Sequence, residues 1–155
     1  MKTTLLQSCG LCRPLLAIAL FLIAVQVATA QKDSIRLQCP LNGASLVQQD
    51  TSGYHWDKHD QKIVLASKDT LVTACHDGKV SNIQMNEEGR WEVVFFFKDY
   101  YIWYSGLSRV YVKKNQSLKA GQPVGYLFPG HELELMVYKF EMQLDPRKLM
   151  ECNAK

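Results

Sequence analysis

Residues 110–125 read VYVKKNQSLKAGQPVG, and the pattern inside this stretch decides the fold. Counted from Val112, it is V-x-x-N-x-x-L-x-x-G-x-x-V-G, so apolar residues and turn formers alternate at every third position. Asn115 and Gly121 tolerate positive φ, and we expect the chain to make a tight corner at each. The positions expected to point inward are Val112, Leu118 and Val124.

The chain on either side of this stretch predicts an all-β fold. From about Ser34 onward it consists of short apolar segments separated by turn residues, without a long stretch of 3.6-residue periodicity. The turn signals Asp77-Gly78 and Glu88-Gly89 separate residues 70–75, 79–85 and 90–98, and an aromatic segment follows at 100–104. We therefore expect these segments to form a meander of antiparallel strands.

Two aromatic segments, WEVVFFF at 91–97 and YYIWY at 100–104, are the expected hairpin at the centre of this meander. In the first, the odd positions share one face while Val94 and Phe96 lie on the other, which predicts a strand covered on both sides. The rings are expected to form a core between packed sheets. A platform on which glycans stack is the alternative interpretation.

The first thirty residues have the features of a secretory signal. Lys2 and Arg13 are the only charges, residues 15–27 are almost wholly apolar, and Ala28-Thr29-Ala30 matches an A-x-A cleavage site. The apolar run is shorter than the roughly 20 residues of a membrane-spanning helix, which argues against a stable anchor. We expect export across the inner membrane to the periplasm or cell envelope.

The remaining chain is expected to form one domain with short extensions. Residues 31–57 are predicted to be a lead-in that packs on the sheet edge through Tyr54 and Trp56, 58–150 the β-domain, and 151–155 a tail. Without the two basic residues of the signal, 16 of the 18 basic residues face 15 acidic ones. A net charge near +1 gives no reason to expect nucleic acid or an anionic membrane surface as a partner.

Three cysteines follow the predicted signal, and none of them has the C-x-x-C spacing of a zinc site. Cys75 lies in an apolar segment and is expected to be a reduced, buried residue. Cys39 and Cys152 flank the predicted β-domain. Since an exported protein meets an oxidising compartment, we predict that these two form a disulfide joining the ends of the domain.

The pattern at 112–125 resembles the half-motif of biotinyl- and lipoyl-type folds and of lysostaphin-type (LytM-like) zinc peptidases. Its surroundings favour the peptidases. Residues 104–108, YSGLS, are similar to their Y-x-H-L segment, residues 70–80 to their T-P-V-x-A-x-x-D-G-x-V turn, and Asp145-Pro146 to their closing D-P. The modifiable lysine hairpin of a lipoyl or biotinyl carrier is missing from the sequence. The resemblance runs from about His59 to Leu149 and implies two packed antiparallel sheets, a duplicated hybrid motif.

Active members of this family hold zinc with the His and Asp of H-x-x-x-D and the second His of H-x-H, whose first His is the base. Here His59 matches the first of these, but Ile63 stands at the Asp position. The H-L-H-F-E strand corresponds to residues 132–136, ELELM, so Glu132 and Glu134 replace both histidines. Gly106 replaces the histidine of Y-x-H-L. The resemblance therefore implies a degenerate member without a zinc cofactor.

Catalytic zinc needs about three protein ligands and an open position for water. The losses imply a non-enzymatic binding or regulatory module whose partner is peptidoglycan or an envelope protein such as a cell-wall hydrolase. One alternative is an active zinc endopeptidase that cuts peptidoglycan cross-links with a rearranged site. Another is a structural domain of a larger envelope assembly. His76 and His131 are expected to be surface residues.

By analogy with the substrate groove of active relatives, a binding groove is predicted over the 132–136 strand. Its predicted residues are His59, Tyr104, Glu132, Glu134 and Tyr138. Because two of them are acidic, the groove is expected to favour a basic or amine-bearing ligand. A merely solvated face at the two glutamates is the alternative.

Overall fold

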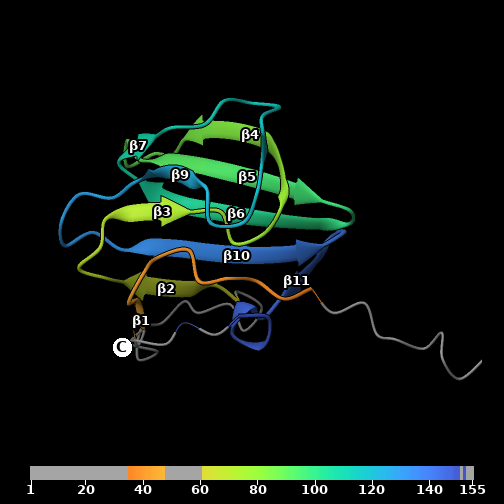
Figure 1. Cartoon of the computed structure of the whole chain (residues 1–155), viewed down its shortest axis with the longest axis horizontal. Helices are drawn as coiled ribbons and strands as arrows, with labels where there is room; N and C mark the ends of the chain where they lie inside the picture. The colour runs from red at the N-terminus through yellow and green to blue at the C-terminus, as the bar shows by residue number, and fades with distance from the viewer. Residues whose placement is uncertain (1–34, 48–60, 151, 153–155) are drawn as a thin grey trace, which may run out of the picture. The chain divides into compact units, whose positions relative to one another are not determined.

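A computed structural model describes residues 35–47, 61–150 and 152, all of which belong to one compact unit, Ile35–Lys155. Figure 1 shows a wide sheet with a smaller sheet packed on it. The strands are β1 (Ser45–Leu46), β2 (Ile63–Ala66), β3 (Leu71–Thr73), β4 (Gly78–Met85), β5 (Trp91–Phe97), β6 (Tyr100–Leu107), β7 (Arg109–Val110), β8 (Ser117–Leu118), β9 (Pro123–Tyr126), β10 (Leu133–Lys139) and β11 (Met142–Leu144). A 3₁₀ helix, η1 (Pro146–Lys148), follows them. Within the described residues no helix has the length and hydropathy of a membrane span.

The large sheet has eight strands in the order β1-β2-β10-β6-β5-β4-β8, with β11 beside β10, and the small sheet has the order β3-β9-β7. Every pair in both sheets is antiparallel. The predicted all-β fold of two packed antiparallel sheets is confirmed. The predicted meander is confirmed for β4, β5 and β6. Residues 70–75 were expected to open it, but β3 pairs with β9 in the small sheet, because its apolar alternation fits either sheet equally well.

The two predicted corners join the sheets. Asn115 has φ 71° and Gly121 has φ 81°. Their backbone N–H groups donate hydrogen bonds to Val80 O and Ala74 O, each at 2.8 Å. The three apolar positions of the pattern are 7, 7 and 0% exposed at Val112, Leu118 and Val124. The structure confirms the predicted corners and the inward positions.

The core lies between the sheets, and Tyr104 crosses it. This side chain is 1% exposed, and its hydroxyl oxygen accepts a hydrogen bond of 2.7 Å from the N–H of Cys75, which follows β3. Burial raises the pKa of Tyr104 well above its usual value and the pKa of the Cys75 thiol to about 12. Cys75 is buried and free, as predicted.

The two faces of β5 differ at its C-terminal end. Val93 and Phe95 point into the core, and Val94 on the other face is 7% exposed, as expected of a strand covered on both sides. Phe96 is 39% exposed and packs against the equally exposed Tyr101, with ring centroids 5.1 Å apart. The prediction of a covered second face is therefore wrong at this end. The core interpretation holds for the inward rings only.

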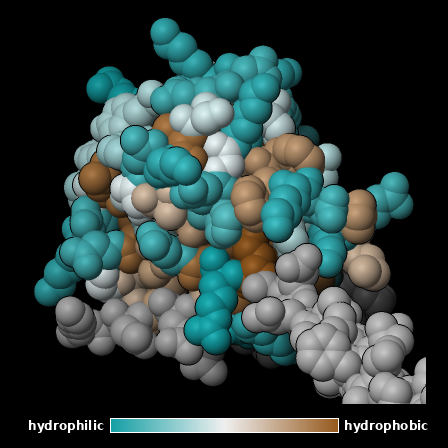
Figure 2. Space-filling view, turned by 45° about the vertical axis from the view of Figure 1, so that its right-hand side comes forward, coloured by the Kyte–Doolittle hydropathy of each residue, from teal (hydrophilic) through white to brown (hydrophobic). Residues whose placement is uncertain are grey.

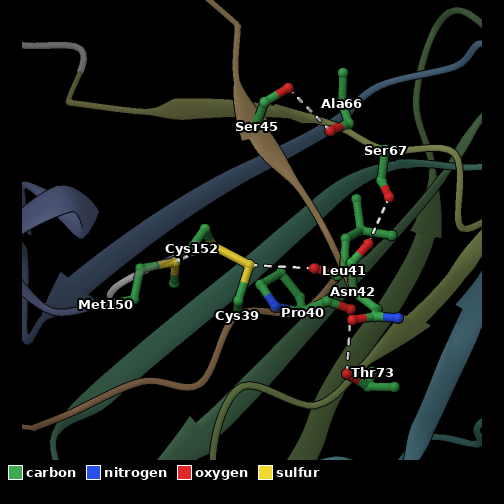
Figure 3. Close-up of a disulfide and its surroundings, with 10 residues drawn as sticks. All are labelled: Cys39, Pro40, Leu41, Asn42, Ser45, Ala66, Ser67, Thr73, Met150 and Cys152. Atoms are coloured by element: carbon green, nitrogen blue, oxygen red, sulfur yellow. Dashed lines mark hydrogen bonds between the residues drawn. A yellow bond between two sulfur atoms is a disulfide. The ribbon is translucent and has the colours of Figure 1, made fainter. Parts of the chain in front are cut away.

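Residues 35–47 pass beside β3, where Thr73 N donates a hydrogen bond of 2.9 Å to Pro40 O, and end in β1 at the edge of the large sheet. They contribute four side chains to the core: Ile35, Leu37, Leu41 and Ala44. A disulfide joins Cys39 to Cys152, with Cα atoms 5.1 Å apart, which confirms the predicted pair (Figure 3). Nearby, Leu37 N donates a hydrogen bond of 2.8 Å to Leu149 O. The two ends of the described chain are thus held together by a covalent bond and by backbone pairing.

Some sequence predictions fall outside the described residues. These are the signal segment 1–30 and the two anchors of the lead-in, Tyr54 and Trp56. Of the predicted tail 151–155, only Cys152 is described. Hydrophobic and hydrophilic side chains are interspersed on the surface of the domain. Figure 2 shows this on one face, where brown hydrophobic atoms lie exposed between teal hydrophilic ones.

Candidate functional site

The outer face of the large sheet is set by alternation in β10. Leu133, Leu135 and Val137 are fully buried in the core. Because successive side chains in a strand point to opposite faces, Glu134 and Tyr138 point outward. The same alternation in β5 and β6 brings further side chains to this face. The strand that carries H-x-H in the family therefore presents a glutamate to the outside of the sheet.

Cross-strand register arranges the outer face in three rows. The polar row consists of Val64, Glu134, Ser105, Glu92 and Gln84. The middle row consists of Met136, Trp103, Val94 and Asn82. The aromatic row consists of Tyr138, Tyr101, Phe96 and Lys79. Most polar side chains thus lie at one end of the outer face, and most aromatic rings lie at the other end.

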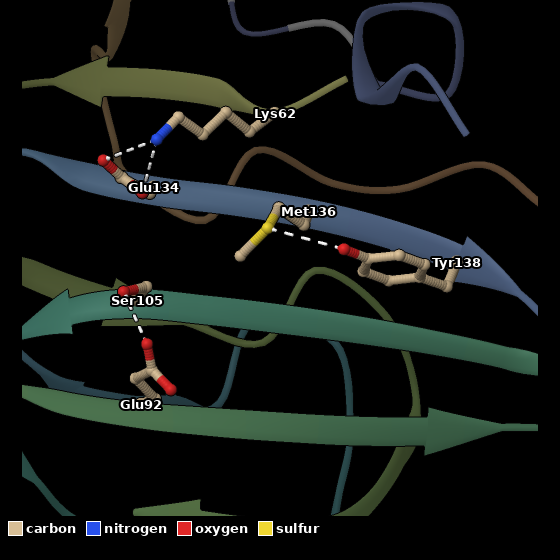
Figure 4. A network of polar contacts seen from close by, with 6 residues as sticks. All are labelled: Lys62, Glu92, Ser105, Glu134, Met136 and Tyr138. Atoms are coloured by element: carbon tan, nitrogen blue, oxygen red, sulfur yellow. Dashed lines mark hydrogen bonds and ion pairs between the residues drawn. The ribbon is translucent and has the colours of Figure 1, made fainter. Parts of the chain in front are cut away.

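An ion pair occupies the polar row at the position of the family's second zinc-binding histidine. Lys62, just before β2, places its Nζ 3.2 Å from Oε2 and 3.3 Å from Oε1 of Glu134 (Figure 4). The Lys62 side chain is 20% exposed and that of Glu134 38% exposed. An ammonium group has no lone pair for a metal and repels cations. A zinc ion does not fit beside it.

The second carboxylate of the polar row, Glu92, is also engaged. Ser105 Oγ donates a hydrogen bond of 3.1 Å to its Oε1, and Gln84 Nε2 donates one of 2.7 Å to its Oε2. Ser105 itself is only 7% exposed. Both oxygens of Glu92 are therefore bound within the sheet, as Figure 4 shows for the contact with Ser105.

The middle row is apolar at Met136 and Val94, and its polar atoms belong to Trp103 and to Asn82, whose Nδ2 donates a hydrogen bond of 2.9 Å to Gln84 Oε1. The indole nitrogen of Trp103 is buried and has no hydrogen-bond partner among the described residues. Next to this row, the Tyr138 hydroxyl lies 3.7 Å from the sulfur of Met136 (Figure 4). A face of this composition can bind an apolar group together with a hydrogen-bond acceptor.

Of the predicted groove residues, the structure brings Glu134 and Tyr138 to one face, and places Glu132 exposed just before β10 in the same alternation. His59 lies outside the described residues. Tyr104 does not belong to the groove, because it faces the core. A binding groove over the H-x-H strand thus stays a prediction, and Tyr104 faces the core instead of this strand's outer face.

Ile63 and Tyr104 are both register partners of Leu135, on either side of β10. All three side chains point into the core, and Ile63 is 4% exposed. An aspartate at position 63 would therefore point away from Glu134, and Lys62 is the residue that faces it. Sequence reasoning missed Lys62 and Trp103. The sequence did contain a signal for both. Ile63 and Tyr104 point into the core, so strand alternation places the preceding residues, Lys62 and Trp103, on the outer face.

Gly106, at the position of the Y-x-H-L histidine, has a backbone that excludes a side chain. Its φ is +96°, and a Cβ atom would lie 2.9 Å from the carbonyl oxygen of Glu132. Histidine is strongly disfavoured at such a φ, and the contact is with backbone, which does not move cheaply. Within 35–47, 61–150 and 152, no three His, Cys, Asp or Glu residues are grouped for a metal.

The two histidines of the described chain that were expected at the surface are both half-buried. His76 packs on Phe97, with ring centroids 4.1 Å apart, and its Nδ1 lies 2.7 Å from Asp77 O. His131 lies against Phe128, and its Nδ1 is buried without a partner among the described residues. Neither histidine lies in a strand, and the register partners of Glu134 are Val64 and Ser105.

These features define a duplicated hybrid-motif β-domain of the metallopeptidase type, with the Lys62–Glu134 ion pair on the outer face of its large sheet. The sequence comparison is specific: the model of peptidase family M23 matches residues 58–146, more than half of the chain. The chain belongs to peptidase family M23. The predicted membership of the lysostaphin/LytM-type family is confirmed. No curated protein matches the chain.

Solved structures with the same fold have low sequence identity to the chain. Helicobacter pylori Csd3 is 20% identical with a TM-score of 0.64, and the match covers 76% of this chain and 35% of Csd3. A chain of the SpoIIQ–SpoIIIAH pore-forming complex is 19% identical with a TM-score of 0.58, covering 77% and 94%. The catalytic domain of the prophage-encoded M23 protein EnpA from Enterococcus faecalis is 20% identical with a TM-score of 0.55, covering 74% and 95%. This chain thus corresponds to about a third of Csd3.

Proposed function

We propose that this chain is an exported cell-envelope module that binds a partner through the outer face of its large sheet and does not hydrolyse peptidoglycan. The observation that carries the proposal is the Lys62–Glu134 ion pair, with 3.2 Å between Nζ and Oε2. It replaces the metal ligands of the family by a fixed cation and its counter-ion. The fold of the family is kept, while the residue at this ligand position is held by an ammonium group.

The zinc chemistry of the family needs about three protein ligands and a bound water. On the outer face, Glu134 is occupied by an ammonium group and Gly106 excludes a histidine. Either feature alone would weaken a metal site, and both are present here. Removal of chelatable metal should therefore change neither folding nor binding.

The outer face favours a partner with mixed polarity. Lys62 neutralises Glu134, so the predicted acidic groove keeps only Glu132 as a free carboxylate within the described residues. The exposed Phe96–Tyr101 pair provides ring surface for stacking. Peptidoglycan and an envelope protein such as a cell-wall hydrolase both fit this composition. A protein partner is supported by the SpoIIQ–SpoIIIAH complex, in which a chain of the same fold is part of a protein assembly.

Binding can be tested by co-sedimentation with purified sacculi and by pull-down from envelope extract. The variant Phe96→Ser with Tyr101→Ser removes the exposed ring pair of the outer face, and we expect capture to fall at least about tenfold. Phe140→Ser is the matched control, since Phe140 is 61% exposed and lies in the β10–β11 turn. Undiminished capture by the double variant would contradict the proposed face.

The absence of hydrolysis needs its own experiment. The protein, purified with added zinc, should contain less than stoichiometric metal and should leave sacculi and oligoglycine substrates intact. Lys62→Met with Glu134→His tests whether removal of the ion pair is enough to restore a metal site. We expect that this variant does not bind zinc, because Gly106 still excludes the histidine of Y-x-H-L. Stoichiometric zinc together with cleavage by the native protein would establish the alternative, an active zinc endopeptidase.

A further inference from the structure

The outer face of the small sheet presents a second set of side chains, distinct from the proposed binding face. Register places Leu71 of β3 opposite Tyr126 of β9, and Tyr126 opposite Arg109 of β7. These three side chains form one row across the sheet. Tyr111 and Phe128 lie close by, just after β7 and just after the central strand β9. The row lies on the side of the small sheet that faces away from the core.

Part of this row surrounds a cavity of about 320 Å³ lined by Ser108, Arg109, Tyr111, Tyr126 and Phe128. Tyr111 is 50% exposed and Phe128 56% exposed, so both rings remain open to a ligand. Phe128 is held edge-to-face by Tyr126 on one side and His131 on the other, at centroid distances of 5.9 and 5.8 Å. The cavity therefore has walls fixed by ring packing.

Arg109 gives the cavity its charge. It is the one charged side chain in the lining, and it makes no ion pair with another described residue. Ser108 Oγ accepts a hydrogen bond of 2.8 Å from Phe128 N, which leaves its hydroxyl hydrogen free to donate. A guanidinium group pairs with carboxylates through two parallel hydrogen bonds. The polar groups of the cavity thus suit a carboxylate next to an apolar group.

A second cavity of about 480 Å³ lies beside β3. Leu71 lines it together with Cys39, Leu41, Asn42, Gly43, Asp69 and Thr73. Since Leu71 is the register partner of Tyr126, one lining residue of each cavity lies side by side in the row. Their only charged lining residues are Arg109 in one and Asp69 in the other. The combined surface has opposite charges at its ends and apolar side chains between them.

We propose that this face binds an extended segment of a partner protein, with a carboxylate on Arg109, an aromatic or branched apolar side chain in the ring-lined cavity, and a basic group toward Asp69. Tyrosine and arginine are the residues that dominate binding energy at protein interfaces, and lysine and glutamate are scarce there. The composition of this row matches that preference. The proposal is independent of the proposed function, which concerns the large sheet.

A synthetic peptide, acetyl-Lys-Val-Gly-Phe-Asp-amide, and its Asn-ended counterpart test the proposal on the full chain. Nuclear magnetic resonance titration should show shifts at the Arg109 Nε–H and the Phe128 ring with the Asp peptide. We expect the Asn peptide to bind at least about tenfold more weakly, because its amide cannot form the charged pair. Equal affinity of the two peptides, or no shift at millimolar concentration, would overturn the proposal.

Variants locate the interaction. Arg109→Gln should weaken the Asp peptide at least about tenfold and abolish its preference over the Asn peptide. Arg147→Gln, at an exposed arginine on η1, is the matched control and should have no effect. Phe96→Ser changes only the large sheet and should leave the peptide affinity unchanged. A loss with the control as large as with Arg109→Gln would show non-specific attraction and refute the assignment.

Discussion

On the outer face of the large sheet, Glu134 lies 3.2 Å from Lys62 Nζ and both oxygens of Glu92 accept hydrogen bonds, whereas Arg109 on the outer face of the small sheet has no ion-pair partner among the described residues. The carboxylates of Glu134 and Glu92 are thus engaged within the sheet, and the guanidinium group of Arg109 is left for a ligand. The polar row of the large sheet is therefore paired internally at these two carboxylates. The opposite sheet carries the more open polar surface.

Both faces rest on one core, which the disulfide stabilises. Cys39 and Cys152 are 113 residues apart in sequence, so the bond removes considerable entropy from the unfolded chain. Replacing both by serine should lower the free energy of unfolding by about 4 kcal/mol, measured by urea denaturation. Reduction of the native protein should give a similar loss. A change below about 1 kcal/mol would show that the unfolded chain gains little freedom when the bond is removed.

Tyr104 couples the two sheets through its hydrogen bond with Cys75 N at 2.7 Å. Tyr104→Phe leaves this buried N–H without its acceptor and should cost about 1–3 kcal/mol of stability. Tyr101→Phe is the matched control on the same strand, where the side chain is 39% exposed, and should change stability by less than about 0.5 kcal/mol. Equal effects would mean that the inner and outer faces of β6 do not differ as described.

A pair of substitutions addresses the contrast between the faces directly. Lys62→Met removes the cation of a half-exposed ion pair and should cost up to about 1 kcal/mol, less at high salt. Arg109→Met removes a charge without an internal partner and should change stability by less than about 0.5 kcal/mol. Urea denaturation at low and high salt measures both. A larger, salt-sensitive loss of unfolding free energy in Arg109→Met would show that the Arg109 charge interacts with another charge of the folded chain.

The smallest expected effect concerns the exposed pair of Asp77 and Lys119. Lys119 Nζ at 2.8 Å and the N–H of Ala120 at 2.9 Å hold the pKa of Asp77 below its usual 3.8. A lowered carboxyl pKa contributes stability above the usual value, and this is lost as the pH falls through the lowered pKa. Asp77→Asn should therefore flatten the profile of melting temperature below about pH 4. An unchanged acid limb would contradict this.

The exposed Asp77–Lys119 pair also serves as a comparison for the Lys62–Glu134 ion pair of the large sheet. Lys119 has a raised pKa because of Asp77, so its contribution is present below its usual value of 10.5 and is lost as the pH rises through the raised pKa. Salt should screen this exposed pair more than the half-exposed Lys62–Glu134 pair. Melting temperatures across both pH limbs, at low and high salt, provide the comparison.

The fold could be predicted because its signals are local. The corners at Asn115 and Gly121 need particular backbone angles, and the alternation of β10 fixes which of its residues point inward. The site was only partly predictable, since spacing along a motif does not say which face a residue takes. A change of one residue in phase moves a side chain to the other side of the sheet, as at Ile63. The partner of residues 70–75 and the ion pair of Lys62 arise from contacts distant in sequence.

Gly106 has a consequence for the history of the chain. With φ at +96° and the Glu132 carbonyl 2.9 Å from any Cβ, a reversion to histidine meets backbone before it meets metal. Side-chain substitutions alone would therefore not place a histidine at this position, because the Glu132 carbonyl would also have to move. In the non-hydrolytic module that we propose, the main chain itself would oppose a return to zinc chemistry.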